Sequence, residues 1–485
     1  GNKVHYQHHG IWFARHGYVC LTIDTLQLGE IEGIHHGTYN HDMWWWNSRG
    51  YSSASVEAWN SIRALDYLET LDFVDKNRFG VTGRSGGGAY SWWISVLDER
   101  IKVSAPVAGI TSLKNHVYAG FKNSGRLAHG VVEGHCDSMF HVNTYRWDFD
   151  HIAALVAPRP LMILNTDDDR IFPLDGVTDV FNGVRRIYDL HGQRNKLGLT
   201  IVPGGHSDTQ PLQVPAFNWF NRHLKGEEGP ITVAAVKLFE PEQLKVFNEL
   251  PADSINADIQ ETFTQLADDK SKPSQKTAEL LRAKTFRGWP AKENSLNAKR
   301  AFSTEYEGVV FEAIDFDSQE HIRLRAYIAY RKGLEKPSRV DVEVLNEEYW
   351  NKYLKLGRPA FADVWGEELE LAKIKADAPV TDKEQQAIEK RMAGVRKGDV
   401  VFVAFMPRGF GLSAMTQDER HITHSRRRFM LLGQTLAGMQ VWDVRRCVRL
   451  VQDLGYACPV TLWGYDTTSS QVALAALFEQ IATVH

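Results

Sequence analysis

The sequence predicts an α/β protein in which a mostly parallel sheet carries helices on both faces, and it predicts this architecture twice. Short apolar segments alternate with amphipathic ones over the first 226 residues, and a second alternation begins after residue 300. Strands that alternate with helices favour parallel pairing, because a parallel connection needs a crossover segment long enough to hold a helix. The third observation is a similarity between the two halves of the chain.

The first region contains five segments with the apolar composition of strands buried on both faces. They cover residues 17–24, 77–83, 104–109, 159–165 and 197–202. Helices are expected at residues 52–71, 89–97 and 215–224, the first because apolar side chains recur at helical spacing behind serines that can cap it. Residues 111–150 interrupt the alternation with Gly, His, Asn and aromatic residues, which indicates an inserted loop or cap over one sheet edge.

The domains expected from these patterns are residues 1–226, a linker with helices at 227–300, and a second α/β domain at 301–485. The linker is rich in Asp, Lys, Ser and Pro. In the second domain, residues 309–316 and 322–330 alternate like paired strands, and residues 340–345 and 400–405 resemble buried strands.

The two halves align without gaps through a helix and, after a two-residue deletion, through a strand and a turn. Gly50 and Trp59 match Gly433 and Trp442, an offset of 383 residues, and the sequence at residues 80–85 then matches residues 461–466 at an offset of 381. A match that continues through helix, strand and turn predicts an internal repeat. Asp466 occupies the position of Ser85 in the second copy, so we expect that copy to be degenerate and non-catalytic, although an aspartate nucleophile is an alternative.

Composition excludes several classes of function. Hydrophobic residues make up 43% and charged residues 24% of the 485 residues, as in soluble globular proteins. The formal charge of −4 provides no positive field for nucleic acid or an anionic membrane, and no apolar run is long enough to span a bilayer. The four cysteines lack metal-type spacing. The abrupt start without Met suggests a mature or truncated chain, so the compartment stays open, with a periplasmic or secreted location favoured.

The strongest chemical signal is the sequence G-R-S-G-G at residues 83–87, between a predicted strand and a predicted helix. A serine on such a tight turn is pushed out of the sheet, and the glycines beside it leave room for the turn. The amide of Gly86 is the expected oxyanion donor, because it lies at a helix N-terminus. The alternative is a glycine-rich turn with an incidental serine. Ser85 is therefore the candidate nucleophile.

A base and an acid follow in the order that a serine nucleophile needs. His206 follows the strand at residues 197–202 in P-G-G-H, and three aspartates follow the strand at residues 159–165. Both groups would lie at the carboxyl edge of the sheet. Asp169 is preferred over Asp167 and Asp168, because its spacing to Pro173 is that of an acid loop. The alternative for His206 is a surface histidine.

These three motifs, in this order and spacing, resemble the α/β-hydrolase superfamily, and within it the acetyl-xylan-esterase-like, dienelactone-hydrolase-like and prolyl-oligopeptidase-like enzymes. The resemblance covers about residues 10–226 and implies an α/β-hydrolase fold with esterase or peptidase chemistry through an acyl-enzyme. It implies Ser85 as nucleophile, His206 as base and Asp169 as the acid that orients it. Arg84 receives no role from the resemblance and remains a candidate substrate contact.

The expected function is that of a serine carboxylic-ester hydrolase acting on acylated carbohydrate. The alternatives are a prolyl-oligopeptidase-like peptidase and an inactive structural or binding homologue. One departure from the superfamily is the second oxyanion donor, which normally follows an earlier strand. No such strand precedes residue 10, so the first domain is expected to lack its leading strands.

Further candidates are weaker. Trp44, Trp45 and Trp46 lie in a loop on the expected catalytic side, where indole rings could stack on a sugar. The alternative is packing, since three successive side chains cannot all face inward. The histidines at positions 35, 36 and 41 lack metal-binding spacing, so no metal and no cofactor are expected. Cys136 has no separate support as a nucleophile. The expected partner is an ester substrate, with no nucleic acid; the oligomeric state stays open.

Overall fold

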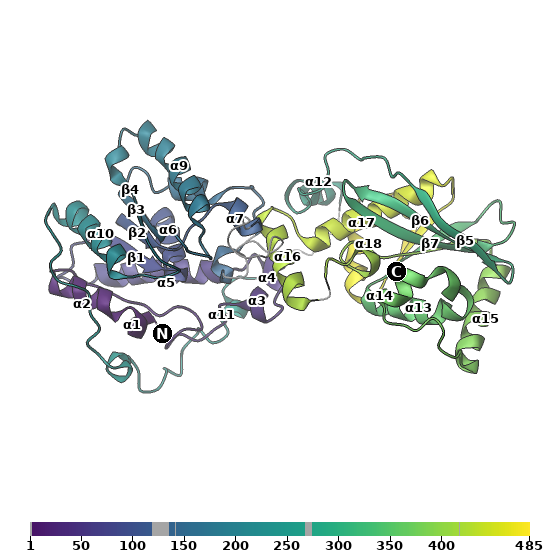
Figure 1. The fold of residues 1–485 in the computed structure, drawn as a ribbon, viewed down its shortest axis with the longest axis horizontal. Helices are drawn as coiled ribbons and strands as arrows, with labels where there is room; N and C mark the ends of the chain where they lie inside the picture. The colour runs from purple at the N-terminus through teal and green to yellow at the C-terminus, as the bar shows by residue number, and fades with distance from the viewer. Residues whose placement is uncertain (1, 119–134, 141, 267–273, 417) are drawn as a thin grey trace. The chain divides into compact units, whose positions relative to one another are not determined.

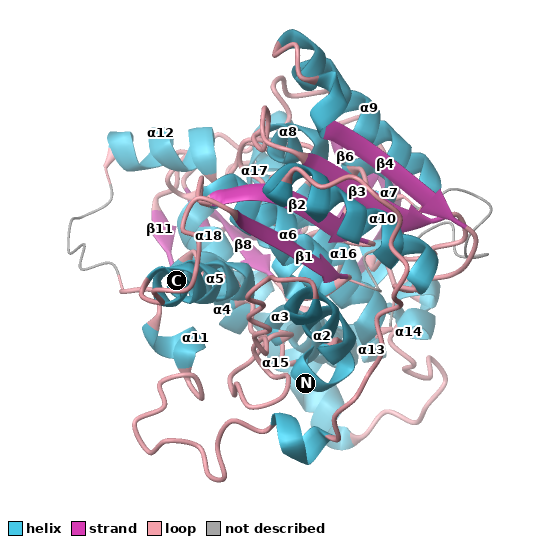
Figure 2. Cartoon of the chain, turned by 90° about the vertical axis from the view of Figure 1, so that its left-hand side faces the viewer, coloured by secondary structure: helices cyan, strands magenta, loops and turns pink. Residues whose placement is uncertain are grey.

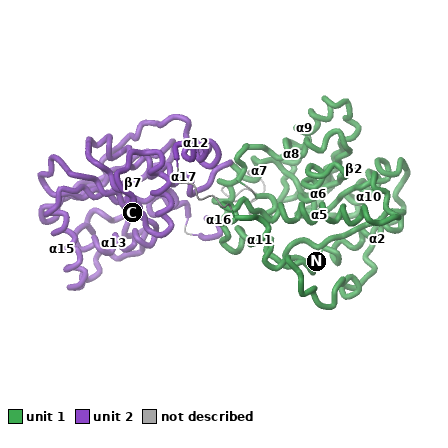
Figure 3. Tube along the Cα trace, turned by 180° about the vertical axis from the view of Figure 1, so that it is seen from behind, with its two compact units in different colours: residues 1–269, 423–432 green, residues 270–422, 433–485 purple. Residues whose placement is uncertain are grey.

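The computed structural model describes residues 2–118, 135–140, 142–266, 274–416 and 418–485. It divides into two compact units (Figure 3). The first unit contains Gly1–Asp269 and Thr423–Leu432, and the second contains Lys270–Ile422 and Gly433–His485. The expected linker at residues 227–300 is therefore shared between the two units.

The sheet of the first unit has four parallel strands in the order β1-β2-β3-β4 (Figures 1 and 2). The strands are β1 (Phe79–Arg84), β2 (Ile101–Val107), β3 (Leu161–Thr166) and β4 (Leu197–Val202). They correspond to four of the five strands expected from the sequence. Because all four are parallel, their carboxyl ends lie at one edge, where open α/β sheets place functional side chains.

Helices of the first unit connect and cover these strands. They are α1 (Asn2–His5), α2 (Gln7–Arg15), α3 (Gly37–Asn40), α4 (Trp45–Arg49), α5 (Ser53–Glu69), α6 (Gly86–Leu97), α7 (Leu113–Val117), α8 (Phe149–Ala154), α9 (Leu174–Leu190), α10 (Gln210–Phe220) and α11 (Ile259–Thr262). Helix α10 begins five residues before the expected start, because Thr209 adopts the extended cap conformation and Pro211 is tolerated in the first turn. Buried aromatic side chains from several helices pack on the sheet, including Trp12, Trp92 and Phe217.

The expected strand at residues 17–24 is wrong. The segment has no regular secondary structure and makes no ladder with any described strand, and Val19 and Leu21 are 47% and 42% exposed. An apolar run becomes a strand only when a neighbour satisfies its backbone groups. Here the nearest strand, β1, is separated from the segment by a cavity that both of them line.

The second unit contains a mixed seven-stranded sheet in the order β11-β10-β8-β9-β7-β6-β5. Figure 1 labels its strands β5, β6 and β7. Its strands are β5 (Lys299–Tyr306), β6 (Val309–Gln319), β7 (Ile322–Arg331), β8 (Arg339–Val344), β9 (Val400–Phe405), β10 (Val460–Gly464) and β11 (Thr483–Val484). Strands β8, β9, β10 and β11 run parallel, whereas β6 and β7 form an antiparallel hairpin and β7 is antiparallel to β9. The second α/β architecture expected from the sequence is thus present as a sheet of its own.

The helices of the second unit complete this architecture. They are α12 (Gln275–Lys284), α13 (Glu347–Phe361), α14 (Gly366–Leu371), α15 (Asp382–Lys397), α17 (Leu436–Asp453) and α18 (Ser469–Ala475). Helix α16 (Glu419–Leu431) begins in the second unit and ends in the first. None of the described helices is long and apolar enough to cross a bilayer.

Candidate active site

Ser85 lies on the turn between β1 and α6 with φ 60° and ψ −118°. Its amide donates to the carbonyl of Val107 at 2.9 Å, so the turn is tied to β2. A side chain at Gly83 would come within 2.6 Å of the Gly87 carbonyl, and one at Gly88 within 2.4 Å of the Val107 carbonyl. The glycines therefore permit the close approach of strand and helix that holds Ser85 in a backbone conformation rarely found outside glycine.

Gly86 is the first residue of α6, so its amide has no carbonyl one turn earlier in the helix to bond. Amides at this position carry the positive end of the helix dipole. The geometry therefore places a potential oxyanion donor directly after the candidate nucleophile.

His206 and Asp169 meet at the carboxyl edge of the sheet. The Nδ1 of His206 lies 2.8 Å from Oδ2 of Asp169, whose side chain is completely buried. The other carboxylate oxygen, Oδ1, accepts from the amides of Ile171 and Phe172 at 2.8 and 3.0 Å. These bonds fix the carboxylate, and the carboxylate fixes the ring so that Nε2 is left for proton transfer. Of the three successive aspartates, Asp167 instead accepts from the amide of Gly204.

Arg84 connects the nucleophile turn to the loop of the base. Its guanidinium donates to the hydroxyl of Tyr6 at 3.1 Å and to the backbone carbonyl of His206 at 3.0 Å. This bond links the turn of Ser85 to the loop of His206, although 121 positions separate these two residues in the sequence. The arginine therefore helps to hold the backbone of His206 in position. Nothing in the local sequence pattern indicates this role.

A wall of the site is formed by the buried polar side chains of His135, Asp137 and Arg427. His135 stacks on Phe172, which in turn stacks on His206, and its Nε2 bonds the carbonyl of Ile171. Burial lowers the pKa of His135 far below its usual value, so this ring is neutral. The completely buried Arg427 donates to the His135 carbonyl and pairs with Asp137 at 3.2 Å, which holds the wall in place.

Cys136 lies in the same wall, and its Sγ would be 3.8 Å from a side chain at Gly86. Burial raises the pKa of this thiol, but the charge and hydrogen bond of His35 more than offset burial and leave the pKa below its usual value. The described residues therefore contain a polarised thiol next to the expected oxyanion position. The rest of the insertion expected at residues 111–150 falls partly outside the described residues.

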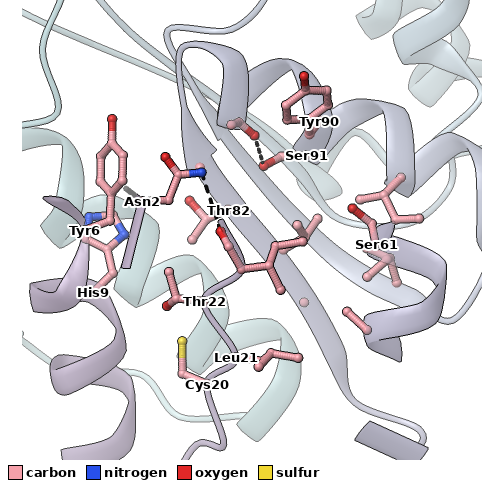
Figure 4. A pocket seen from close by; sticks show the side chains of 18 of the residues that line it. Asn2, Tyr6, His9, Cys20, Leu21, Thr22, Ser61, Thr82, Tyr90 and Ser91 are labelled. Carbon is pink, nitrogen blue, oxygen red and sulfur yellow. Dashed lines mark hydrogen bonds between the residues drawn. The ribbon is translucent and has the colours of Figure 1, made fainter. Parts of the chain in front are cut away.

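A cavity of about 750 Å³ opens beside Ser85 and Gly86. Figure 4 shows it between the segment that carries Cys20, Leu21 and Thr22 and the strand that carries Thr82. Helix α5 closes one side through residues such as Ser61. Most of the cavity follows the edge of β1, and its polar end contains the nucleophile turn together with His135 and Cys136.

The three tryptophans expected to contact substrate do not line this cavity. Trp46 is 2% exposed and packs with Leu26 and Tyr51 in a small core of its own. Trp45 joins the same core from outside, and Arg426 covers the ring of Trp44. The histidines at positions 35 and 36 line the cavity, where His35 contacts Cys136.

Residues 35–192 match the model of a family described as glucuronyl esterase, fungi. The chain is 27% identical over 210 residues to the hydrolase YtaP of Bacillus subtilis. The matched residues cover 43% of this chain and 66% of that protein. It is 24% identical over 244 residues to a 4-O-methyl-glucuronoyl methylesterase of Phanerochaete carnosa, covering 45% of this chain and 58% of that enzyme. The chain thus spans less than two thirds of the length of these relatives.

Among solved structures, a family 15 glucuronoyl esterase from Caldicellulosiruptor kristjansonii is 22% identical and covers 39% of this chain and 56% of that one. Its TM-score of 0.31 is too low to support an inference. The matched residues 35–192 include the turn of Ser85 and the loop of Asp169. The prediction of an α/β-hydrolase fold is confirmed for the first unit, which over residues 35–192 resembles the family of fungal glucuronyl esterases.

Proposed function

We propose that the first unit is a serine carboxylic-ester hydrolase that acts through an acyl-enzyme on esters of carbohydrates. The observation that carries this proposal is the pair of His206 and Asp169 at 2.8 Å, at the same sheet edge as a serine held at φ 60° on a strand-to-helix turn. A glycine-rich turn with an incidental serine would not need a buried carboxylate and an oriented imidazole at the same sheet edge.

The reaction follows from these groups. Ser85 attacks the ester carbonyl while Nε2 of His206 removes its proton, and the Gly86 amide donates to the oxyanion that forms. His206 then gives the proton to the leaving alcohol, which leaves an acyl group on Ser85. A water molecule, deprotonated by His206, attacks this acyl-enzyme, and protonated His206 returns the proton to Ser85 as the acid leaves. Asp169 keeps the correct tautomer of His206 throughout.

Two kinds of carbohydrate ester are compatible with this chemistry. In an acetylated polysaccharide the sugar supplies the alcohol, whereas in a glucuronate ester the sugar supplies the acid. The resemblance to acetyl-xylan-esterase-like enzymes favours the first kind. The similarity to the fungal glucuronyl esterase family and to the 4-O-methyl-glucuronoyl methylesterase of Phanerochaete carnosa favours the second. Both kinds need the same nucleophile, so the distinction is one of substrate and not of mechanism.

Labelling with a fluorophosphonate tests the proposal. The wild-type protein should label and Ser85→Ala should not, while Ser55→Ala, an exposed serine on α5, should label like wild type. Failure of the wild type to label contradicts the proposal and favours the inactive homologue, whereas labelling of Ser85→Ala contradicts the assignment of Ser85 as nucleophile.

A substrate panel then separates the remaining alternatives. Acetylated xylo-oligosaccharide, methyl glucuronate and an acyl-peptide are compared at equal concentration with wild type and Ser85→Ala. Hydrolysis of either sugar ester supports the proposal and identifies the kind of ester. Hydrolysis of the peptide alone supports the prolyl-oligopeptidase-like alternative.

A further inference from the structure

Three potential metal ligands converge behind the loop that carries His206. His8 and His9 lie in the first turn of helix α2, and Asp208 lies two residues after His206 in the loop before α10. One ligand atom from each of the three side chains lies within 4.8 Å of the other two. About 200 positions separate Asp208 from the two histidines in the sequence, so their convergence is a product of the fold.

The polar atoms of this group are buried and unsatisfied. His9 is 10% exposed and Asp208 is 3% exposed at their side chains. No hydrogen bond reaches Nδ1 of His8, Nε2 of His9 or either carboxylate oxygen of Asp208. A buried carboxylate without any hydrogen bond costs several kcal/mol. Asp208 forms an ion pair with Nε2 of His9 at 3.0 Å but accepts no hydrogen bond, so the protein compensates its burial only in part.

The geometry of His9 and Asp208 fits a shared ion better than a direct hydrogen bond. Nε2 of His9 lies 3.0 Å from Oδ2 of Asp208, but the approach fails the angular requirement of a hydrogen bond. Two ligands of a tetrahedral zinc ion at about 2.0–2.1 Å are separated by about 3.3 Å. The separation of 3.0 Å between Nε2 of His9 and Oδ2 of Asp208 is close to this value. Two atoms that bind one ion direct their lone pairs at the ion and not at one another.

The side chain of Gln213 connects His8 with the loop of Asp208. Its amide nitrogen lies 3.2 Å from Nε2 of His8 and donates to the backbone carbonyl of Asp208 at 2.9 Å. Nδ1 of His8 is buried and has no hydrogen-bond partner within the described residues. Figure 4 shows His9 beside Tyr6, the residue whose hydroxyl accepts from Arg84.

We propose that His8, His9 and the carboxylate of Asp208 form a binding site for a divalent zinc ion, with water completing the coordination. Two imidazoles and one carboxylate are a ligand set that zinc accepts. The ion would tie α2 to the loop that carries His206. This site is independent of the proposed esterase activity, because it is defined by metal binding alone.

Metal titration of the whole chain tests the site. Protein freed of metal by a chelator is titrated with Zn²⁺ in competition with a chromophoric chelator, and one ion per chain is expected to bind in the micromolar range or tighter. Asp208→Asn and His9→Ala should each weaken binding by at least about a hundredfold, since loss of a ligand should cost no less than loss of an outer partner. His5→Ala, a neighbouring histidine outside the cluster, should bind like wild type.

Two further readouts keep the test decisive if a variant folds poorly. Zn²⁺ should raise the unfolding temperature of wild type and His5→Ala but not that of Asp208→Asn. Co²⁺ bound to wild type should show the visible absorption of a tetrahedral site with nitrogen and oxygen ligands. Absence of stoichiometric binding by folded wild type, or unchanged affinity in both ligand variants, overturns the proposal.

Discussion

Helices α5 and α17 have matching sequences but different surroundings. The offset of 383 residues places Ser53, the first residue of α5, on Leu436, the first residue of α17. Yet α17 buries thirteen of its residues, whereas α5 buries five. The matched tryptophans show the difference most clearly, since Trp442 is 3% exposed and Trp59 is 52% exposed.

The sheets explain the difference. In the second unit, Trp442 donates to the carbonyl of Ser318 on β6, and β10 is paired by β8 on one side and β11 on the other. In the described part of the first unit, β1 is paired only by β2. Its other edge, which corresponds to the edge of β10 that pairs with β8, borders the cavity. The same helix and strand pattern is therefore completed in one unit and left open in the other. Burial of a helix depends on the strands that meet it, not on its own pattern.

The turns after β1 and β10 also correspond. Ser85 has φ 60° and Asp466 has φ 49°, both in the left-handed region that favours glycine. Two strained positions at matched turns are in keeping with the internal repeat predicted from the sequence. The predictions below use this correspondence, from the largest expected effect to the smallest.

Substitution of the two turn residues should have different consequences in the two units. Ser85→Ala should lower ester hydrolysis by at least about 10⁴-fold, because the covalent route is lost. Asp466→Ser should leave the wild-type rate unchanged and should not restore activity to Ser85→Ala. Initial rates with p-nitrophenyl acetate measure both effects. Activity regained by the double variant would show that the second unit is a competent hydrolase.

Truncation of the matched tryptophans should separate the two helices in stability. Trp442→Ala should destabilise the second unit by about 3–5 kcal/mol, because it empties a buried site and leaves the Ser318 carbonyl unpaired. Trp59→Ala should cost less than about 1 kcal/mol, because half of its surface is already in water. Differential scanning calorimetry of the two variants measures the difference. Equal losses would mean that α5 is covered in solution.

A third matched pair differs in charge. Glu57 of α5 is 1% exposed and accepts from the amide of Leu26, and its counterpart in α17 is Gln440. Burial raises the pKa of Glu57 to about 7. The folded state therefore holds this proton more tightly than the unfolded state, so the stabilising contribution is complete below about pH 4 and is lost as pH rises through about 7.

Glu57→Gln should remove this pH dependence. Above pH 7 the variant should be more stable than wild type by an amount on the order of 3 kcal/mol, and at pH 5 the difference should be small. Calorimetry at pH 5 and pH 8.5 measures how the difference in stability between the variant and wild type changes with pH. Gln440→Glu is the reciprocal variant in the second unit. A difference between Glu57→Gln and wild type that does not change with pH would contradict this explanation.

The smallest effect is expected at Arg84, which has Tyr465 as its counterpart. Arg84→Met should lower kcat about tenfold with little change in KM, because the loss of one hydrogen bond to the His206 carbonyl costs about 1–2 kcal/mol in placing the base. Arg84→Lys should recover part of the rate, and Tyr6→Phe serves as the control for the other bond of the guanidinium. A change in KM alone would instead favour the expected substrate contact.

Several elements could be predicted from the sequence because their signals are local. The strand at residues 197–202 has the predicted bounds, and α5 begins and ends within two residues of its expected limits. The order of Ser85, Asp169 and His206 was sufficient to expect them at one sheet edge, since parallel strands end on the same side. The structure places His206 on Asp169 rather than on the other two aspartates, consistent with the choice made from the spacing to Pro173.

Other features depend on contacts between distant residues and carry no local signal. The segment at residues 17–24 has the composition of a strand, but composition cannot say whether a partner strand lies beside it. Arg84 could not be identified as the brace of His206, nor His8, His9 and Asp208 as a cluster, because each contact joins residues far apart in the sequence.

The sequence by itself therefore determined the α/β pattern, the nucleophile turn, the order of the three candidate catalytic residues and the similarity between the two halves. These features follow from hydrophobic periodicity and from the few residues that a tight turn allows. Only the tertiary structure decided which helix face is buried, which strand edge stays open and which polar groups meet without a partner. Those outcomes depend on long-range neighbours, because backbone and buried polar groups are satisfied in space and not along the chain.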